Sequence, residues 1–118
     1  MPITLYLYSK CSTCQAAANF LTKQNTLFTK KEITLTPPSI QELQQMLGYL
    51  GNDLKKLFNS SGLLYKELKL KEKLPSLTLD EALLLLSQNG MLVKRPFLIG
   101  DAFGLVGFNE KKWSEMKM

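Results

Sequence analysis

Histidine is absent from this sequence, and Arg95 is its single arginine. Without histidine, the chain cannot form a Ser-His-Asp or Cys-His catalytic arrangement, or a metal site with imidazole ligands. All the other basic residues are lysines, and lysine lacks the planar fork with which arginine grips an oxyanion. Any chemistry must therefore come from cysteine, lysine, tyrosine or carboxylates.

The sequence also lacks long apolar runs and blocks of one charge. No run approaches the roughly 20 residues that span a bilayer, and the first residues lack the positive segment and apolar core of a signal peptide. The 15 basic and 10 acidic residues are spread along the chain and give a net charge of +5. We therefore expect a cytoplasmic protein that binds neither nucleic acid directly nor a membrane.

With 118 residues, of which 45% are apolar, the chain is long enough for one packed domain and too short for two. β-Branched and aromatic residues predict a strand over residues 3–8, buried on both faces. The alanine-rich segment that starts at Cys14 predicts a helix. A second strand is predicted over residues 26–33.

The middle of the chain, about residues 39–89, predicts several helices. One spans about residues 39–50, short helical pieces follow over 54–73, and another covers about 79–88. The capping candidates are Thr36 or Ser39 for the first helix and Ser76 or Thr78 for the last. Two apolar runs, 96–99 and 105–107, then predict a hairpin, and a final helix runs from about Asn109 to the end of the chain. The predicted class is α/β, in the order β-α-β, helices, β-β-α.

Cys11 and Cys14 are the two cysteines, and they lie at the predicted strand-to-helix turn together with Ser12 and Thr13. The free N–H groups and partial positive charge of a helix N-terminus favour a thiolate, and Lys10 adds a positive neighbour. In such a pair the first sulfur is the exposed nucleophile, and the second, shielded one turn into the helix, resolves the mixed disulfide. We therefore predict that Cys11 attacks and Cys14 resolves.

Plainer interpretations of this cysteine pair are open. Half of a zinc site is one, but two cysteines without histidine cannot close a tetrahedral site within one chain, so we predict no metal. Two small buried apolar residues are another. A structural disulfide is disfavoured in a reducing cytosol. The three-residue spacing at a strand–helix junction favours redox or thiolate chemistry.

Arg95 is the second candidate site residue. A residue before proline is restricted to extended backbone, so Arg95-Pro96 predicts an extended segment with the arginine at the mouth of the following strand. The plainer interpretation is a solvated surface cation. Because this is the single position where the chain carries an arginine in place of a lysine, we predict a functional role.

Five segments together resemble the arsenate reductase-related branch of the thioredoxin superfamily, which contains glutaredoxin-coupled arsenate reductases and the Spx-type regulators of bacterial RNA polymerase. They are ITLYLY, KCSTC, LFNSSGLLYKELKLKEKL, SLTLDEALLLLSQNGMLVKRPFLIG and VGFNEKKW. The resemblance implies a thioredoxin-like fold with a helical insertion at about 39–89. It also implies a cis Pro96 packed against the cysteine pair. Cys11 would take the position of the family's nucleophile, and Arg95 that of the arginine beside it.

The chain departs from the arsenate reductases of this branch in its oxyanion site. Those enzymes hold the oxyanion with three arginines, in the helical insertion, in the Arg-Pro dipeptide and on the last strand. Here Arg95 stands alone, and the other two neighbourhoods are residues 59–62 and 106–108, which contain no arginine. No arginine follows Cys11 closely either, which excludes a phosphatase-like C-x5-R loop. We therefore expect negligible arsenate reduction.

The resemblance leaves two functions open. One is a monomeric, cofactor-free thiol–disulfide oxidoreductase, with glutathione as a candidate co-substrate, the glutathione or thioredoxin system as reductant, and Arg95 steadying a thiolate or an anionic substrate. The other is an Spx-type redox-sensing regulator that binds the C-terminal domain of the RNA polymerase α subunit. Such regulators contact the polymerase through the helical insertion, around a glycine and a basic residue. Gly51 matches the glycine, but Ser60 or Ser61 stands in place of the basic residue.

Overall fold

A four-stranded sheet forms the centre of the computed structural model, which describes residues 2–116 and 118. The strands are β1 (Thr4–Leu7), β2 (Thr29–Glu32), β3 (Phe97–Ile99) and β4 (Gly104–Val106), and their order in the sheet is β2-β1-β3-β4. β1 pairs in parallel with β2, whereas the β1–β3 and β3–β4 pairs are antiparallel. The predicted order of β-α-β, helices and β-β-α is confirmed.

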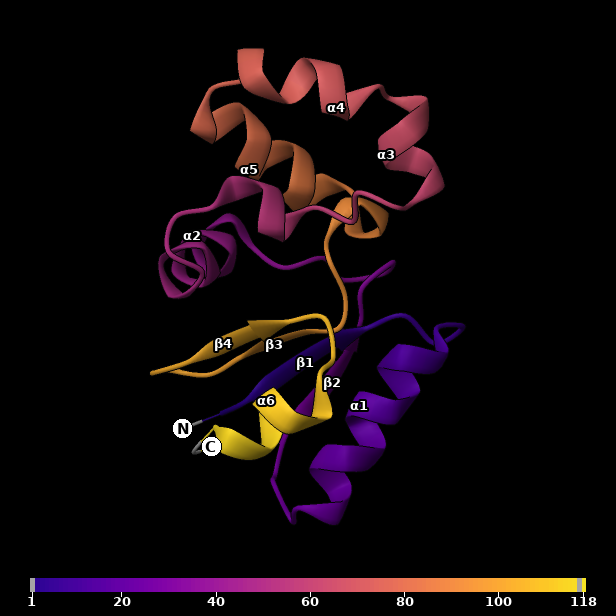
Figure 1. Ribbon diagram of the computed structural model, residues 1–118, viewed down its shortest axis with the longest axis vertical. Coiled ribbons are helices and arrows are strands. Elements are labelled where there is room, and N and C mark those ends of the chain that lie inside the picture. The colour runs from indigo at the N-terminus through magenta and orange to yellow at the C-terminus, as the bar shows by residue number, and fades with distance from the viewer. Residues whose placement is uncertain (1, 117) are drawn as a thin grey trace.

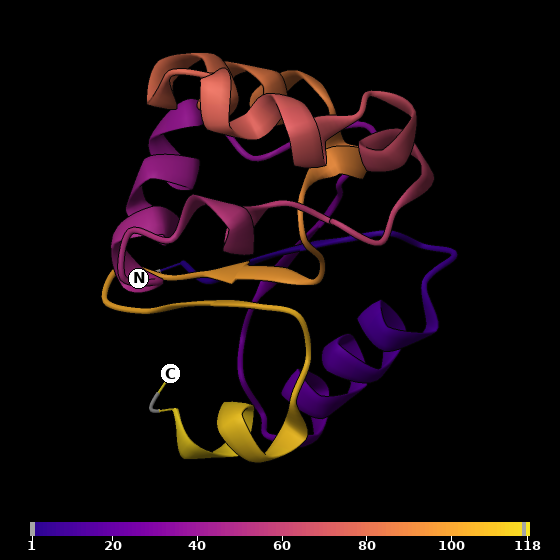
Figure 2. The same cartoon turned by 45° about the horizontal axis from the view of Figure 1, so that its top comes forward.

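Helices cover both faces of this sheet (Figure 1). One face carries α1 (Ser12–Lys23) and α6 (Glu110–Glu115). The other carries α2 (Ile40–Tyr49), α3 (Leu63–Glu67), α4 (Leu70–Lys73) and α5 (Leu79–Gln88), together with the 3-10 turns η1 (Leu54–Leu57), η2 (Leu74–Ser76) and η3 (Gly90–Leu92). Figures 1 and 2 show these elements between β2 and β3, the helical insertion, together on one side of the sheet, with α2 nearest the strands and α3 and α4 farthest from them.

The alternation of side chains along β1 supplies a core to each layer. Tyr6 packs in the cluster under the helical insertion, where its ring meets Phe97 edge-on at 5.7 Å. Leu5 and Leu7 point the other way, into the cluster closed by α1 and Trp113 of α6. All three β1 side chains are at most 7% exposed, which confirms a strand buried on both faces. Each such side chain stabilises the fold by about 1.5–3 kcal/mol.

Two capping boxes fix the starts of the long helices in the insertion. The Ser39 hydroxyl accepts from the Glu42 N–H at 3.1 Å, and the Glu42 carboxylate accepts from the Ser39 N–H at 3.0 Å. Thr78 and Glu81 repeat this arrangement at the start of α5. Of the candidate caps, Ser39 and Thr78 are the ones followed three residues later by glutamate, which explains why they cap and Thr36 and Ser76 do not.

Some predicted boundaries are wrong. The second strand begins at Thr29, not at residue 26, because Thr26 donates its N–H to Leu21 and so belongs to the turn that ends α1. α1 begins at Ser12, two residues before the predicted start, because the Cys11 sulfur caps it. α6 ends at Glu115 and the backbone of Met116 is extended, so the predicted helix to the end of the chain is too long; residue 117 lies outside the described residues.

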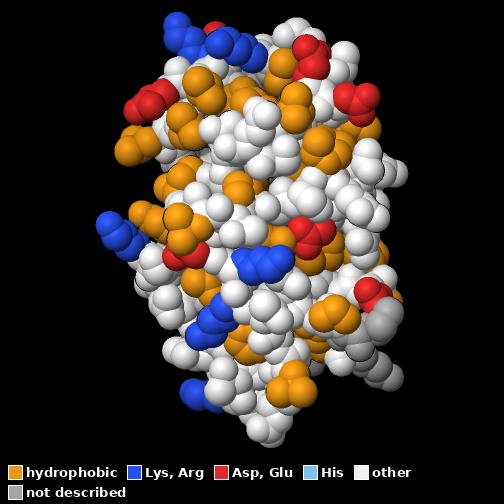
Figure 3. Space-filling view, turned by 180° about the vertical axis from the view of Figure 1, so that it is seen from behind, with side chains coloured by type: hydrophobic (Ala, Val, Ile, Leu, Met, Phe, Trp, Pro, Cys, Tyr) orange, Lys and Arg blue, Asp and Glu red, His pale blue; other side chains and the backbone are white. Residues whose placement is uncertain are grey.

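On the face shown in Figure 3, Lys and Arg side chains lie among Asp and Glu side chains and form no continuous basic patch. No helix within residues 2–116 and 118 combines the length and the apolar character that crossing a membrane requires.

Gly90 joins the helical insertion to the sheet. A Cβ atom there would overlap the carbonyl oxygen of Ile33, which directly follows β2. Gly48, within α2, is the contrasting case, because a Cβ there would meet no atom within 4 Å. The close approach at Gly90 therefore requires glycine, whereas Gly48 does not.

We predict opposite effects for Gly90→Ala and Gly48→Ala. Gly90→Ala should lower the free energy of unfolding by at least about 2 kcal/mol, because backbone must move to relieve the overlap. Gly48→Ala should raise it by about 0.5–1 kcal/mol, since alanine loses less entropy in a helix. Urea denaturation of the two variants measures both values. Equal effects would show that Gly90 does not make this close approach.

Candidate functional site

The turn after β1 makes Cys11 the N-cap of α1. Its backbone is extended, with φ −102° and ψ 117°, and its Sγ accepts the backbone N–H of Cys14 at 3.4 Å. A sulfur thus occupies the place that a Ser or Asp oxygen usually takes at a helix start. Because a helix N-terminus favours negative charge, this position suits a thiolate better than a thiol.

The two free cysteines differ in burial. Cys11 is partly exposed, whereas Cys14 is 0% exposed and its Sγ accepts the backbone N–H of Tyr8 at 3.5 Å. This confirms the prediction that the first cysteine is accessible and that the second is shielded within the first turn of the helix.

The same environment separates the acidity of the two thiols. Burial acts to raise the pKa of Cys11, but hydrogen bonds from the Cys14 thiol and N–H, the charge of Arg95 and the Thr13 N–H together lower it below its usual value. Burial raises the pKa of Cys14 to about 12, with a further increase from the neighbouring Cys11 and an opposing effect of the Tyr8 N–H. Cys11 therefore loses its proton first.

Arg95 reaches the cysteines through the β1–β3 pairing. Tyr6 faces Phe97 across the two strands, so continuing the register by two residues brings Arg95 opposite Tyr8. The guanidinium carbon lies 5.0 Å from the centroid of the Tyr8 ring, a cation–π contact. The peptide bond between Arg95 and the buried Pro96 is cis, as predicted.

The Arg95 guanidinium keeps hydrogen-bonding capacity. Its buried Nη1 has no hydrogen-bond partner among the residues that the structure describes. Buried donors are normally paired, and a cationic one is best satisfied by an anion. Arg95 is therefore suited to steadying a thiolate or an anionic group of a bound molecule.

A cavity of about 440 Å³ opens beside Arg95, against the helical insertion. Its lining residues are Asn59, Ser61, Gly62, Leu63, Leu64, Glu67, Met91 and Arg95. The structure thus brings the 59–62 segment to Arg95, as the resemblance implies. Arg95 is the one cation in this lining and Glu67 the one carboxylate, so the cavity is not strongly positive.

The other predicted site residues contribute less to the environment of Cys11. Thr13 acts through its backbone N–H toward Cys11. Lys10 and Ser12 are exposed, and neither side chain makes a hydrogen bond within the described part of the chain. The cation that lowers the pKa of Cys11 is thus Arg95 and not its sequence neighbour Lys10.

Two residues near the cysteines were missed from the sequence. Tyr8 contacts both Cys14 and Arg95, and the Glu32 carboxylate accepts the Ser9 N–H at 3.0 Å, which ties β2 to the turn that precedes Cys11. The sequence signal that could have identified Tyr8 was its position at the end of a buried strand, directly before the cysteine turn. The sequence carried no such signal for Glu32, because its contact with Ser9 arises from the parallel pairing of β1 with β2.

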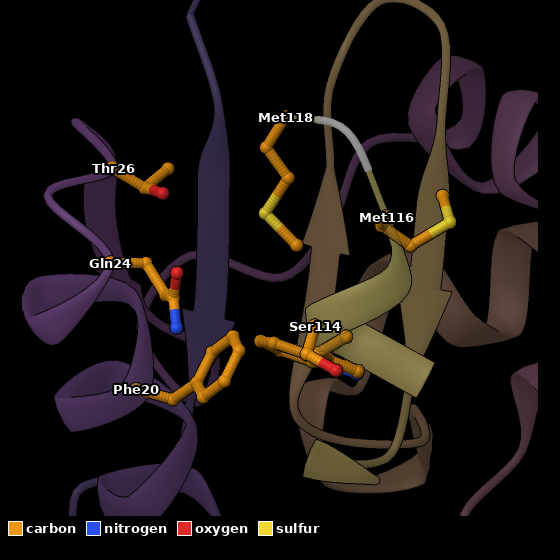
Figure 4. A pocket seen from close by; sticks show the side chains of 7 residues that line it. Phe20, Gln24, Thr26, Ser114, Met116 and Met118 are labelled. Atoms are coloured by element: carbon orange, nitrogen blue, oxygen red, sulfur yellow. The ribbon is translucent and has the colours of Figure 1, made fainter. Parts of the chain in front are cut away.

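A second hollow lies at the opposite end of α1, about 18 Å along the helix from Cys11. Figure 4 shows it between Phe20 and Gln24 on one side and Ser114 and Met116 on the other, and its volume is about 180 Å³. No cysteine or arginine lines it. Nor do three His, Cys, Asp or Glu side chains come together as metal ligands anywhere in the described residues.

Residues 6–116, which include Cys11, Cys14 and Arg95, match the model of the ArsC family. The chain belongs to the ArsC family. It is 43% identical over 115 residues to the uncharacterized protein YusI of Bacillus subtilis, covering 98% of each chain. It is also 27% identical over 108 residues to the global transcriptional regulator Spx of Streptococcus mutans, covering 92% of this chain and 77% of Spx.

A solved structure of an ArsC family related protein from Bacteroides fragilis superimposes with a TM-score of 0.90 at 42% identity, covering 99% of this chain and 98% of that one. The likeness confirms the predicted thioredoxin-like fold. It also confirms the predicted family, with its arsenate reductase-related and Spx branches.

In this ArsC family protein, Arg95→Ala should raise the pKa of Cys11, because the positive charge that stabilises its thiolate is removed. The rate of alkylation by iodoacetamide, followed against pH in a Cys14→Ser background, reports this pKa, since only the thiolate reacts. Lys94→Ala is the matched control: it also removes one positive charge, from the preceding residue, and no effect of Lys94 on Cys11 is found. Equal shifts in both variants would contradict a specific role for Arg95.

Proposed function

We propose that this protein is a thiol–disulfide oxidoreductase in which Cys11 is the nucleophile and Cys14 the resolving thiol. The observation that carries the proposal is the contrast between the two sulfurs on one helical turn. Cys11 is accessible and has a lowered pKa, whereas Cys14 is buried and its pKa is raised to about 12. Attack and resolution need this order of reactivity.

In the first step the Cys11 thiolate attacks one sulfur of a substrate disulfide. The Cys11–substrate bond forms, the substrate S–S bond breaks, and the second substrate sulfur leaves as a thiolate that takes up a proton. Cys14 stays protonated during this step because of its high pKa. The N–H groups at the start of α1 and the charge of Arg95 hold the attacking sulfur in its anionic form.

In the second step Cys14 attacks the Cys11 sulfur of the mixed disulfide. Once Cys11 is in a disulfide it carries no negative charge, so its contribution to the raised pKa of Cys14 disappears, while the Tyr8 N–H still stabilises the Cys14 thiolate. The Cys11–Cys14 bond forms and the substrate leaves as a thiol. The substrate has gained two electrons and the cysteine pair has lost two, which a thiol reductant must return.

The pair itself holds the two electrons, so this chemistry needs no cofactor. Arg95 in the cavity favours a disulfide that carries a carboxylate, and glutathione disulfide, which has carboxylates on both halves, is a candidate of that kind. Glutathione or the thioredoxin system would return the electrons.

Disulfide turnover tests this proposal. Wild-type protein should reduce glutathione disulfide when thioredoxin and its reductase are supplied, and its oxidised form should be lighter by about 2 Da, since two thiol hydrogens are lost. Cys11→Ser should lose activity by roughly 1,000-fold or more. Cys14→Ser should accumulate a mixed disulfide at Cys11, visible as an added glutathione in the intact mass. Retention of activity in Cys11→Ser would refute the assignment.

Arsenate is disfavoured as a substrate by the same geometry. A thiolate that approaches an oxyanion is repelled unless donors around the anion are already in place. Around Arg95 the cavity supplies serine and asparagine, and Glu67 adds a negative side chain. Each missing donor typically costs about 2.7–4 kcal/mol of transition-state stabilisation, a factor of roughly 100–1,000 in rate.

We therefore predict negligible arsenate reduction with glutathione and glutaredoxin supplied. Ser61→Arg, which places a second arginine in the cavity beside Arg95, should increase arsenate turnover relative to wild type. Ser60→Arg is the matched control, because Ser60 lines a different hollow. An arsenate turnover of about 1 per second or faster in the wild-type protein would contradict this prediction.

A transcription regulator of the Spx type is the second candidate. It is supported by the match to Spx over 92% of this chain, and by exposed Gly51, whose φ of +72° and open surroundings place it on the surface of the helical insertion. A pull-down with the C-terminal domain of the RNA polymerase α subunit, set beside the turnover assay, distinguishes the two functions. Binding without turnover would favour the regulator.

A further inference from the structure

β4 is the edge strand of the sheet, and a groove runs along it between η1 of the helical insertion and α6. Two adjoining hollows of about 410 Å³ and 270 Å³ form it, and both are lined by Lys94, Leu105, Val106 and Lys112. Lys55 and Lys56 of η1 complete the larger hollow. We call this feature the β4 groove and define it by these six residues.

The β4 groove is positive along both sides. Lys55 and Lys56 stand on the side of the helical insertion, Lys112 stands on the side of α6, and Lys94 precedes β3. No Asp or Glu is found in the described lining of either hollow. Elsewhere, as in Figure 3, positive and negative side chains are mixed.

The floor between these lysines is apolar. Leu105 and Val106 of β4 are half-buried, and the buried Phe58 lies beside them in the larger hollow. A simple inorganic anion would gain nothing from such a floor, whereas an extended peptide that carries both acidic and apolar residues would contact the floor and the lysines.

β4 also offers backbone groups for pairing. Gly107 donates its N–H to Pro96 at 2.9 Å, and in an antiparallel pair the bonded residues alternate. Leu105, two residues before Gly107, therefore directs its N–H and C=O toward β3. Val106 directs both groups the other way, into the β4 groove.

We propose that the β4 groove binds an acidic, extended segment of a partner protein, which adds a strand to the sheet beside β4. The segment pairs with the backbone of Val106, and its side chains alternate between the two faces of the sheet. On the face of the helical insertion it meets Phe58 and the lysines of η1, and on the face of α6 it meets Leu105 and Lys112. Each face therefore receives both apolar side chains and carboxylates. This binding is independent of the thiol chemistry, since neither cysteine lines the groove.

A fluorescent peptide of about nine residues, in which pairs of glutamates alternate with pairs of valines so that each face of the added strand carries both, tests the proposal. It should bind the full-length protein, with an affinity that falls as salt is raised from about 20 to 300 mM, while a peptide with lysine in place of glutamate should not bind. Replacing Lys55, Lys56, Lys94 and Lys112 together by glutamine should weaken binding by about tenfold or more.

The matched control replaces four exposed lysines outside the groove, Lys23, Lys30, Lys71 and Lys73, by glutamine. It changes the net charge equally and should alter the affinity less than about twofold. An equal loss of affinity in both quadruple variants would overturn the proposal. So would a failure of the peptide to bind the wild-type protein, which is the result expected if the lysines only protect the edge strand from self-association.

Two further measurements separate strand addition from other binding. Hydrogen exchange of the Val106 amide should slow in the complex, whereas exchange of the Leu105 amide, already bonded to β3, should not change. Unchanged exchange at Val106 would overturn strand addition. Cys11→Ser should bind the peptide as wild type does; loss of binding there would show that the peptide occupies the thiol site instead.

Discussion

The antiparallel pairing of β1 with β3 is the constraint on which the site depends. Cys11 lies near the start of the chain and Arg95 near its end, and no local sequence signal joins them. The register that sets Tyr6 opposite Phe97 carries Arg95 to Tyr8, three residues before Cys11. A shift of one residue would turn the β3 side chains to the other face and take the guanidinium away from the thiolate.

The pairing persists because β1 belongs to both cores. Tyr6 anchors the layer of the helical insertion, where its hydroxyl donates to the Glu42 carboxylate at 2.6 Å, and Leu5 and Leu7 anchor the layer of α1 and α6. Slipping the register would expose these side chains and break the bond to α2. The stability of the two layers and the geometry of the thiol site therefore rest on the same strand.

Local signals in the sequence predicted what depends on local structure. The cysteine spacing at a strand–helix junction placed Cys11 and Cys14 correctly, and the Ser39 and Thr78 caps follow from glutamates three residues later. The second strand was predicted too long, because residues around Thr26 alternate like a strand but complete the end of α1. Tertiary contacts override local propensity there.

Features assembled from distant segments could not be predicted in this way. The cavity beside Arg95 is formed by residues 59–67 together with Met91 and Arg95, and the β4 groove contains lysines that are as far apart in the sequence as Lys55 and Lys112. Scattered lysines gave no sign of a common surface. The cation–π contact between Tyr8 and Arg95 likewise depends on strand register, which a single sequence does not specify.

The proposed thiol chemistry requires the two cysteines on one helical turn to have unequal reactivity. Limited alkylation of the reduced wild-type protein at pH 7 tests it directly, because trypsin releases residues 11–23 as one peptide that contains both cysteines, and fragmentation shows which one is modified. We expect nearly all of the first label on Cys11. Equal labelling of Cys11 and Cys14, or a preference for Cys14, would contradict it.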